Sequence, residues 1–190
     1  MLRREASDRQ KRFEAYVLPH LDVMYRAAVR LMGGRTEAED LVQEACLRAF
    51  AAIDQLREVG SVKAWLFMIL RTTYARRWGE DPYRRSAVSV ADIEGSAGDL
   101  RDVVYDHYEN DPAYTRLVGA DIRRAIASLP PLYREIVVLA DVAELSYREM
   151  ARVLRVPLGT VMSRLSRGRR MLRASLREYA RTQAPRGSQT

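Results

Sequence analysis

The sequence predicts an all-α protein of two small helical modules joined by a flexible acidic linker, with a helix-turn-helix in the second module. Two observations support this fold class. Apolar residues recur at helical spacing before residue 79 and again after residue 112. The stretch between them contains glycine, proline and serine without a sustained apolar period, and would be unusually long for a loop inside one domain. We therefore expect a first module over 8–78, a linker over 79–112, a second module over 113–180 and a polar tail over 181–190.

Charge follows the same division of the chain. Residues 1–78 have a net charge of +4, residues 79–112 of −6 and residues 113–190 of +9, in a chain of 190 residues and net charge +7. Two basic modules favour a polyanionic partner such as nucleic acid. The single cysteine excludes an internal disulfide, and the first ten residues lack the apolar core of a signal peptide. We expect a cytoplasmic protein.

The first module should begin with a helix from about Asp8 to Met32. Proline clashes inside a helix, so a kink or restart is expected at Pro19, and Gly33-Gly34 is a stop signal. A second helix should begin at a capping box formed by Thr36 and Glu39.

The second helix has an apolar stripe and a polar face. Cys46 lies on the stripe and is expected to be inert core. Taken alone, the polar face would usually be solvated surface. The stripe consists of Ala38, Leu41, Val42, Ala45, Cys46, Ala49, Phe50 and Ile53, and the polar face of Asp40, Gln43, Glu44 and Arg48.

A third helix is expected after Ser61, a favourable N-cap residue. Its first part, 64–70, is apolar nearly all round and should be the centre of the module. Its second part, 71–78, interleaves arginines with Tyr74 and Trp78, which suits phosphate binding and base stacking. A helix C-terminus that favours cations would give the same composition.

The second module should contain four helices. A short one carries Ile122, Ala125, Ile126 and Leu129, and a strongly apolar one follows over 132–140. Ser146 and Glu149 then form a capping box, and Arg155-Val156-Pro157 separates that helix from the next. Two short helices joined by such a turn are typical of a helix-turn-helix. The last helix should place Val161, Leu165, Gly168 and Leu172 inward.

The outer face of that last helix is polar and basic. Seven arginines lie between Arg164 and Arg181 against one acid, Glu178, so like charges repel unless an anion neutralises them. The first residues of a recognition helix reach base edges, while later cations hold phosphates. The outer residues are Thr160, Ser163, Arg164, Arg167 and Arg170.

Three stretches, 36–50, 64–78 and 129–172, together resemble a bacterial RNA polymerase sigma factor. The sequence is similar to the small extracytoplasmic-function (ECF) subgroup, which has only the second and fourth conserved regions. The resemblance covers about 20–80 and 120–178. It implies that the chain is not an enzyme, needs no metal or cofactor, and binds the largest-subunit coiled coil and the flap of core polymerase, promoter DNA and an anti-sigma factor.

The resemblance also implies roles for particular residues. Met162 and Thr72 depart from the residues that many members have at those positions. The residues that would dock on polymerase are Asp40, Gln43, Glu44 and Arg48. Those implied for the −10 element are Lys63, Arg71, Tyr74, Arg76 and Arg77. Those implied for the −35 element are Tyr147, Arg148, Thr160, Ser163, Arg164, Arg167 and Arg170.

Three alternatives remain open on the residues alone. An enzyme is disfavoured, because neither a glycine-rich phosphate loop nor metal-ligand spacing is present, and His20 beside Pro19 suits a turn better than a ligand. An ordinary helix-turn-helix regulator would bind duplex DNA without polymerase, but leaves the two faces of the first module unexplained. A sigma mimic that binds only an anti-sigma factor would not need the outer arginines.

Overall fold

The structure is a computed structural model that describes residues 2–56, 62–78 and 119–183. Within these ranges every regular element is helical, which confirms the all-α prediction. The predicted linker, 79–112, lies outside the described residues. In chain order the elements are α1 (Leu2–Tyr16), the 3₁₀ turn η1 (Leu18–His20), α2 (Leu21–Met32), α3 (Arg35–Ala52), the 3₁₀ turn η2 (Ile53–Gln55), α4 (Val62–Trp78), α6 (Gly119–Ser128), α7 (Pro131–Val137), the π-helical turn η7 (Val138–Val142), α8 (Tyr147–Leu154) and α9 (Leu158–Gln183).

The break predicted at Pro19 is confirmed. Pro19 lies in the first turn of η1, where a missing amide hydrogen costs nothing, and a new helix starts at Leu21. Gly33 ends α2 with a left-handed φ of 78°, and its N–H donates to the carbonyl of Val29 at 2.9 Å. His20 is half-buried at the start of α2, as expected of a turn residue.

The capping box predicted at Thr36 and Glu39 is wrong. Helix α3 begins two residues earlier than this box requires, at Arg35 rather than Glu37, and its N-cap residue Gly34 makes no side-chain bond. Thr36 is therefore already inside the helix and cannot cap it. Instead, the side chain of Glu37 folds back over Gly34, where a carboxylate is favoured by the positive end of the helix dipole.

The core of the first module lies between α2, α3 and α4. Small residues of α2 and α3 are fully buried and let the two helices approach closely, while Phe67 of α4 fills the centre. The predicted stripe is confirmed for Ala38, Leu41, Ala45, Ala49 and Ile53, whereas Val42 and Cys46 are half-buried and Phe50 is 39% exposed.

The second module contains the predicted helix-turn-helix. The capping box is confirmed: Glu149 N–H donates to Ser146 Oγ, and Glu149 Oε2 accepts from Ser146 N at 2.8 Å. Arg155 ends α8 in the left-handed region with φ of 55°. Of the residues on the predicted short helix, Ala125 and Ile126 are buried and Ile122 is 36% exposed. The four residues predicted to point inward on α9 are all buried: Val161, Leu165, Gly168 and Leu172.

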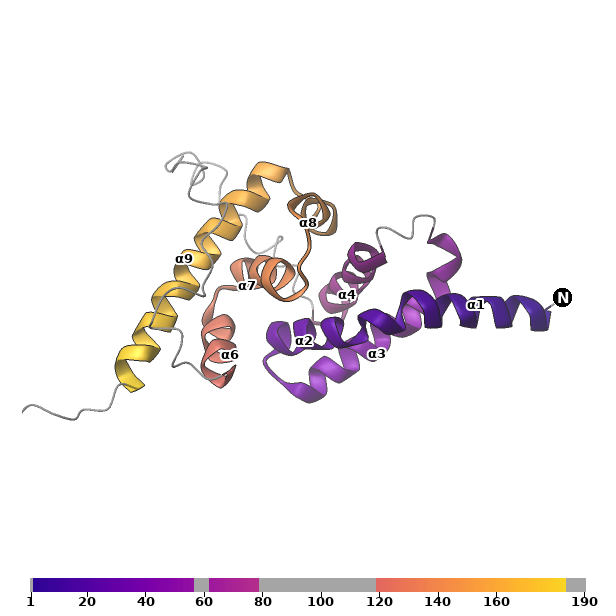
Figure 1. The fold of residues 1–190 in the computed structure, drawn as a ribbon, viewed down its shortest axis with the longest axis horizontal. Helices are drawn as coiled ribbons and strands as arrows, with labels where there is room; N and C mark the ends of the chain where they lie inside the picture. The colour runs from indigo at the N-terminus through magenta and orange to yellow at the C-terminus, as the bar shows by residue number, and fades with distance from the viewer. Residues whose placement is uncertain (1, 57–61, 79–118, 184–190) are drawn as a thin grey trace, which may run out of the picture.

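The two modules pack directly against each other (Figure 1). Helix α2 contacts α6, α7 and η7, and α4 contacts α8. Buried residues of both modules join into one continuous cluster. Nothing in the sequence pattern indicated this contact, and it determines how much of the first module is exposed.

Candidate nucleic-acid and polymerase interfaces

The outer face of α9 carries the residues predicted for duplex DNA. Residues three and four apart share one side of a helix, and five of the predicted residues have this spacing on α9: Thr160, Ser163, Arg164, Arg167 and Arg170. Ser163 donates to the carbonyl of Thr160 at 3.2 Å, so its hydroxyl can still accept. Thr160, Ser163, Arg164 and Arg167 are half-buried and Arg170 is exposed; on α8, Tyr147 is half-buried and Arg148 exposed.

Other arginines hold the second module together. Arg169 donates from Nη2 to Asp141 Oδ1 at 2.5 Å, which ties α9 to η7. Arg124 of α6 lies 5.9 Å above the ring of Tyr179, near the end of α9. The sequence did not separate these anchoring arginines from those of the outer face. These two contacts link α9 to η7 and to α6.

Helix α4 brings together most of the residues predicted for single-stranded DNA. Lys63, Arg71 and Tyr74 are half-buried, and Arg76 is exposed. The Arg77 side chain is not among the described ones. Arg71 is ion-paired across the module boundary: its Nε lies 2.9 Å from Oε1 of Glu135, with 14% and 7% of the two side chains exposed.

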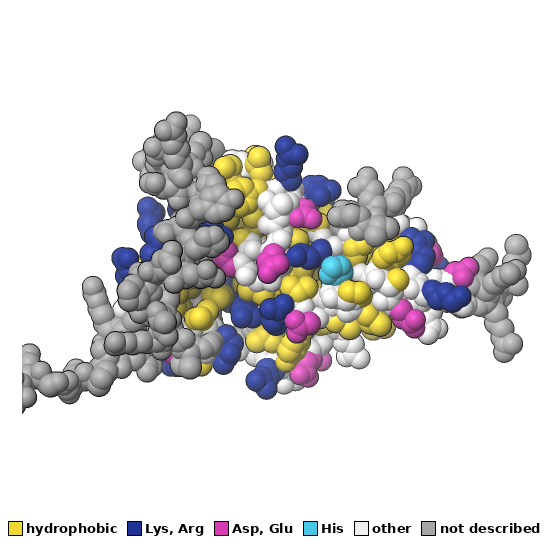
Figure 2. All heavy atoms as spheres, viewed as in Figure 1, with side chains coloured by type: hydrophobic (Ala, Val, Ile, Leu, Met, Phe, Trp, Pro, Cys, Tyr) yellow, Lys and Arg dark blue, Asp and Glu magenta, His cyan; other side chains and the backbone are white. Residues whose placement is uncertain are grey.

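Lys63, in the first turn of α4, influences the pKa of two neighbouring groups, His20 and Glu149. Burial, followed by the nearby Lys63 charge, lowers the pKa of His20. Burial raises the pKa of Glu149. Hydrogen bonds from the Ser146 hydroxyl and amide, together with the charges of Arg152 and Lys63, have the opposite and larger effect, so the pKa of Glu149 lies below its usual value. The charge of Lys63 therefore acts on a group in each module. Figure 2 shows basic and acidic side chains interspersed on the face where the modules meet.

The residues predicted to bind polymerase lie along α3. Asp40 is half-buried and Gln43 exposed, while Arg48 donates to Glu44 Oε1 from Nη2 at 2.5 Å and from Nε at 3.1 Å. Leu47 is 66% exposed on the same side, one turn from Gln43. A single exposed leucine is ordinary on a protein surface and does not by itself distinguish a docking face from solvated surface. From the sequence, Leu47 was assigned to neither the apolar stripe nor the polar face.

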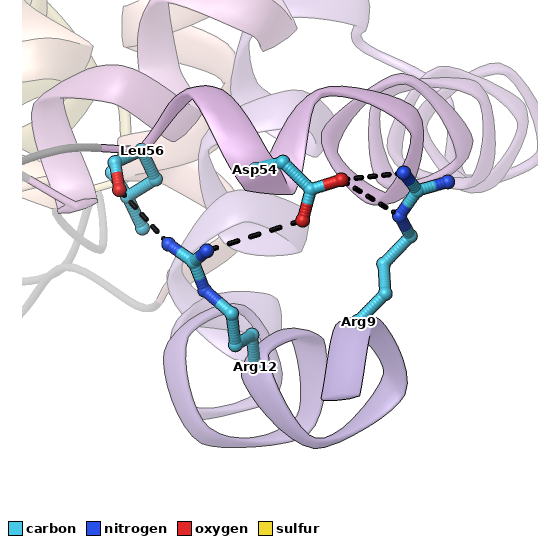
Figure 3. Close-up of polar contacts among 4 residues, drawn as sticks. All are labelled: Arg9, Arg12, Asp54 and Leu56. Carbon is cyan, nitrogen blue, oxygen red and sulfur yellow. Dashed lines mark hydrogen bonds and ion pairs between the residues drawn. The ribbon is translucent and has the colours of Figure 1, made fainter. Parts of the chain in front are cut away.

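Helix α1 is fastened to the end of the α3 segment by two arginines (Figure 3). Arg9 pairs with Asp54 through both Nε and Nη2, and Arg12 donates from Nη2 to the carbonyl of Leu56 at 2.9 Å. Arg12 also lies 3.9 Å from Asp54. These contacts hold the last described residue before α4 in a defined place.

The described residues provide no metal centre: no three His, Cys, Asp or Glu side chains gather where they could hold an ion. The thiol of Cys46 is half-buried, and burial raises its pKa, which keeps it protonated and unreactive. Among the helices described, none has the length and apolarity needed to cross a membrane.

Known proteins match both modules. Residues 16–80 match the Sigma-70 region 2 family and residues 119–172 the Sigma-70, region 4 family. ECF RNA polymerase sigma factor SigW of Bacillus subtilis is 32% identical over 170 residues, which is 89% of this chain and 91% of SigW. ECF RNA polymerase sigma factor SigE of Mycolicibacterium smegmatis is 34% identical over 178 residues, 88% of this chain, which spans 63% of that relative's length.

A solved structure has a similar fold. It is a co-crystal structure of the sigma factor RpoE in complex with the anti-sigma factor NepR from Bartonella quintana, at a TM-score of 0.62 and 28% identity. The match covers 86% of this chain and 96% of that one. With both regions matched in order and a relative covered almost end to end, this chain belongs to the ECF family of RNA polymerase sigma factors.

Proposed function

We propose that this chain binds core RNA polymerase in the cytoplasm and directs it to promoters, without catalytic activity of its own. In this proposal α3 docks on the coiled coil of the largest polymerase subunit, and α4 binds the single-stranded −10 element. The second module binds the −35 element and contacts the polymerase flap. An anti-sigma factor, as in the complex of the structural relative, would restrain it. The proposal rests mainly on the outer face of α9. Its arginines lie on the second helix of a helix-turn-helix, in a chain that matches both the Sigma-70 region 2 and region 4 families.

Run-off transcription with core polymerase is the deciding experiment. We expect transcripts from a cognate promoter only when this chain is added. An ordinary helix-turn-helix regulator would bind duplex DNA without polymerase and give none. A sigma mimic would bind an anti-sigma factor but neither DNA nor polymerase.

The polymerase surface is tested by charge reversal on α3. Asp40→Arg together with Glu44→Arg should abolish pull-down of core polymerase, because both changes reverse charge on the proposed docking face. Asp22→Arg is the matched control, since Asp22 is 80% exposed on α2 and outside that face. If the double variant still pulls down core polymerase as the wild type does, this face of α3 is ordinary solvated surface.

The −35 surface is tested on matched and mutated promoter sites. A lost base contact should cost ~1–3 kcal/mol at one base pair, whereas a lost phosphate contact weakens binding to all sequences alike. Arg164→Ala and Arg167→Ala are therefore compared with Arg177→Ala, an exposed arginine ten residues beyond Arg167 on the same helix. If neither variant weakens binding at any site, the assignment to α9 is wrong.

The module boundaries remain a proposal as well. A first module over 8–78 and a second over 113–180, with α9 continuing to Gln183, would leave 79–112 as the segment most open to proteases. Limited proteolysis should cut first between residues 80 and 111. Earlier cleavage within the described helices would contradict these boundaries.

A further inference from the structure

An ion pair ties α9, the second helix of the helix-turn-helix, to the turn that precedes α8. Arg169 of α9 donates from Nη2 to Oδ1 of Asp141 in η7 at 2.5 Å, and 27% and 23% of the two side chains are exposed. Because most of the pair is hidden from water, its charges are screened less than those of a fully exposed pair. The two residues lie 28 positions apart, so the contact restrains one element relative to the other.

Asp141 belongs to a π-helical turn. In η7 the N–H of Ala143 donates at 3.0 Å to the carbonyl of Val138, five residues back instead of the four of an α-helix. Each residue of this wider turn is rotated less about the helix axis, so Asp141 points in a different direction than it would if α7 continued unchanged. Single π-helical turns are frequent at functional sites.

Arg169 lies in the same turn of α9 as two outer cations. Arg167 and Arg170, which we assign to the −35 element, are two residues before it and one residue after it. Directly before it is Gly168, where an added Cβ would lie 2.9 Å from the side chain of Val137 on α7. The ion pair therefore acts on a turn of α9 that combines close packing with outer cations.

The pair adds a directional restraint to a helix whose inner side is apolar. That side packs against α6, α7 and α8 (Figure 1). Its buried residues are Val161, Leu165, Leu172 and Leu176. Burial of apolar surface is non-directional, whereas a charge-assisted hydrogen bond weakens steeply when its distance and angle change. The contact with Asp141 therefore limits rotation and sliding of α9 more sharply than apolar packing does.

We propose that Asp141 is a positioning residue for −35 recognition, which holds Arg169 and, through it, the outer face of α9. The inference rests on the proposed role of α9 in reading the −35 element. Hydrogen bonds to base edges need donor–acceptor distances of ~3 Å, whereas attraction to phosphates acts over ~10 Å at ~0.1 M salt. A displaced α9 would therefore lose discrimination between base pairs and keep most of its non-specific attraction to DNA.

The test compares binding of the full chain to two fluorescein-labelled duplexes, one with a matched and one with a mutated −35 element. Asp141→Asn keeps the shape of the side chain and removes its charge. We expect the ratio of the two affinities to fall ~10-fold, which is about the value of one base contact. Affinity for the mutated duplex should stay close to that of the wild type. An equal loss on both duplexes would overturn the positioning role, because a damaged module loses both kinds of binding.

Glu144→Gln is the matched control, because it removes the same charge from an exposed residue three positions further along the chain. It should leave the affinity ratio unchanged, which excludes a general effect of charge on DNA binding. If Glu144→Gln lowers the ratio as much as Asp141→Asn does, the positioning role is overturned.

Arg169→Gln breaks the pair from the other side and leaves η7 untouched. It should lower the affinity ratio by about the same factor as Asp141→Asn, and the double variant should be little worse than either, because both changes remove one interaction. Effects that multiply in the double variant would refute the coupling, and so would single variants that discriminate as well as the wild type. Failure of the proposed −35 role has a different signature, since the wild type itself would then bind both duplexes equally.

Discussion

Gly168 lies where α9 packs tightly against α7, and it gives a sharp test of the packing. A Cβ at Gly168 would lie 2.9 Å from Cγ2 of Val137 and 3.3 Å from the carbonyl oxygen of Tyr133. Neither neighbour is the end of a flexible chain, since one is a short branched side chain and the other is backbone. Gly168→Ala should therefore force α9 away from α7, although alanine is the better helix former.

The size of the effect follows from two opposing terms. Replacing glycine by alanine inside a helix stabilises by ~1 kcal/mol, and overpacking a filled core costs ~1–3 kcal/mol. Gly159, in the first turn of the same helix, has nothing within 4 Å of an added Cβ. Gly159→Ala should keep only the stabilising term. The free energies of unfolding of the two variants should therefore differ by ~1–3 kcal/mol, with Gly168→Ala the less stable.

Urea denaturation followed by circular dichroism measures both variants under the same conditions. Binding to a −35 duplex provides a second readout, because a displaced α9 would also misplace its outer face. Equal stability of Gly168→Ala and Gly159→Ala would refute the close approach of α9 to α7.

Further predictions concern single contacts. Ser146→Ala should lower the free energy of unfolding by ~1 kcal/mol in a thermal melt, because it removes a helix cap. The pKa of Glu149 is lowered in the folded state. Its contribution to the free energy of unfolding is therefore present above the usual carboxyl pKa and is lost as the pH falls through the lowered value. Glu149→Gln should abolish that part of the loss of stability in acid. Leu165→Ala, at a fully buried position, should cost ~2–5 kcal/mol in urea titrations, and a loss below ~1 kcal/mol would place Leu165 outside the core. Arg12→Ala should increase amide exchange at Leu56, while unchanged exchange would mean that its carbonyl contact is unimportant.

Local patterns of the sequence were sufficient for the helices and for the helix-turn-helix. The Ser146 capping box and the inward row from Val161 to Leu172 depend on residues within one or two turns, so spacing alone identifies them. The same holds for the restart at Pro19, which follows from the missing amide hydrogen of proline. The capping box at Thr36 failed because the same spacing is compatible with a helix that starts two residues earlier.

The sequence by itself determined the helical fold, the basic outer face of α9 and the family. Only the tertiary structure showed which arginine of α4 is paired with a carboxylate of the second module. Arg71 and Glu135 lie 64 residues apart, and their pairing depends on how two separately formed modules fit, to which no local periodicity is sensitive. The exposure of Leu47 was likewise decided by which helices pack around α3. Spacing along a helix specifies the face on which a residue lies, but the partners of that face are set by long-range packing.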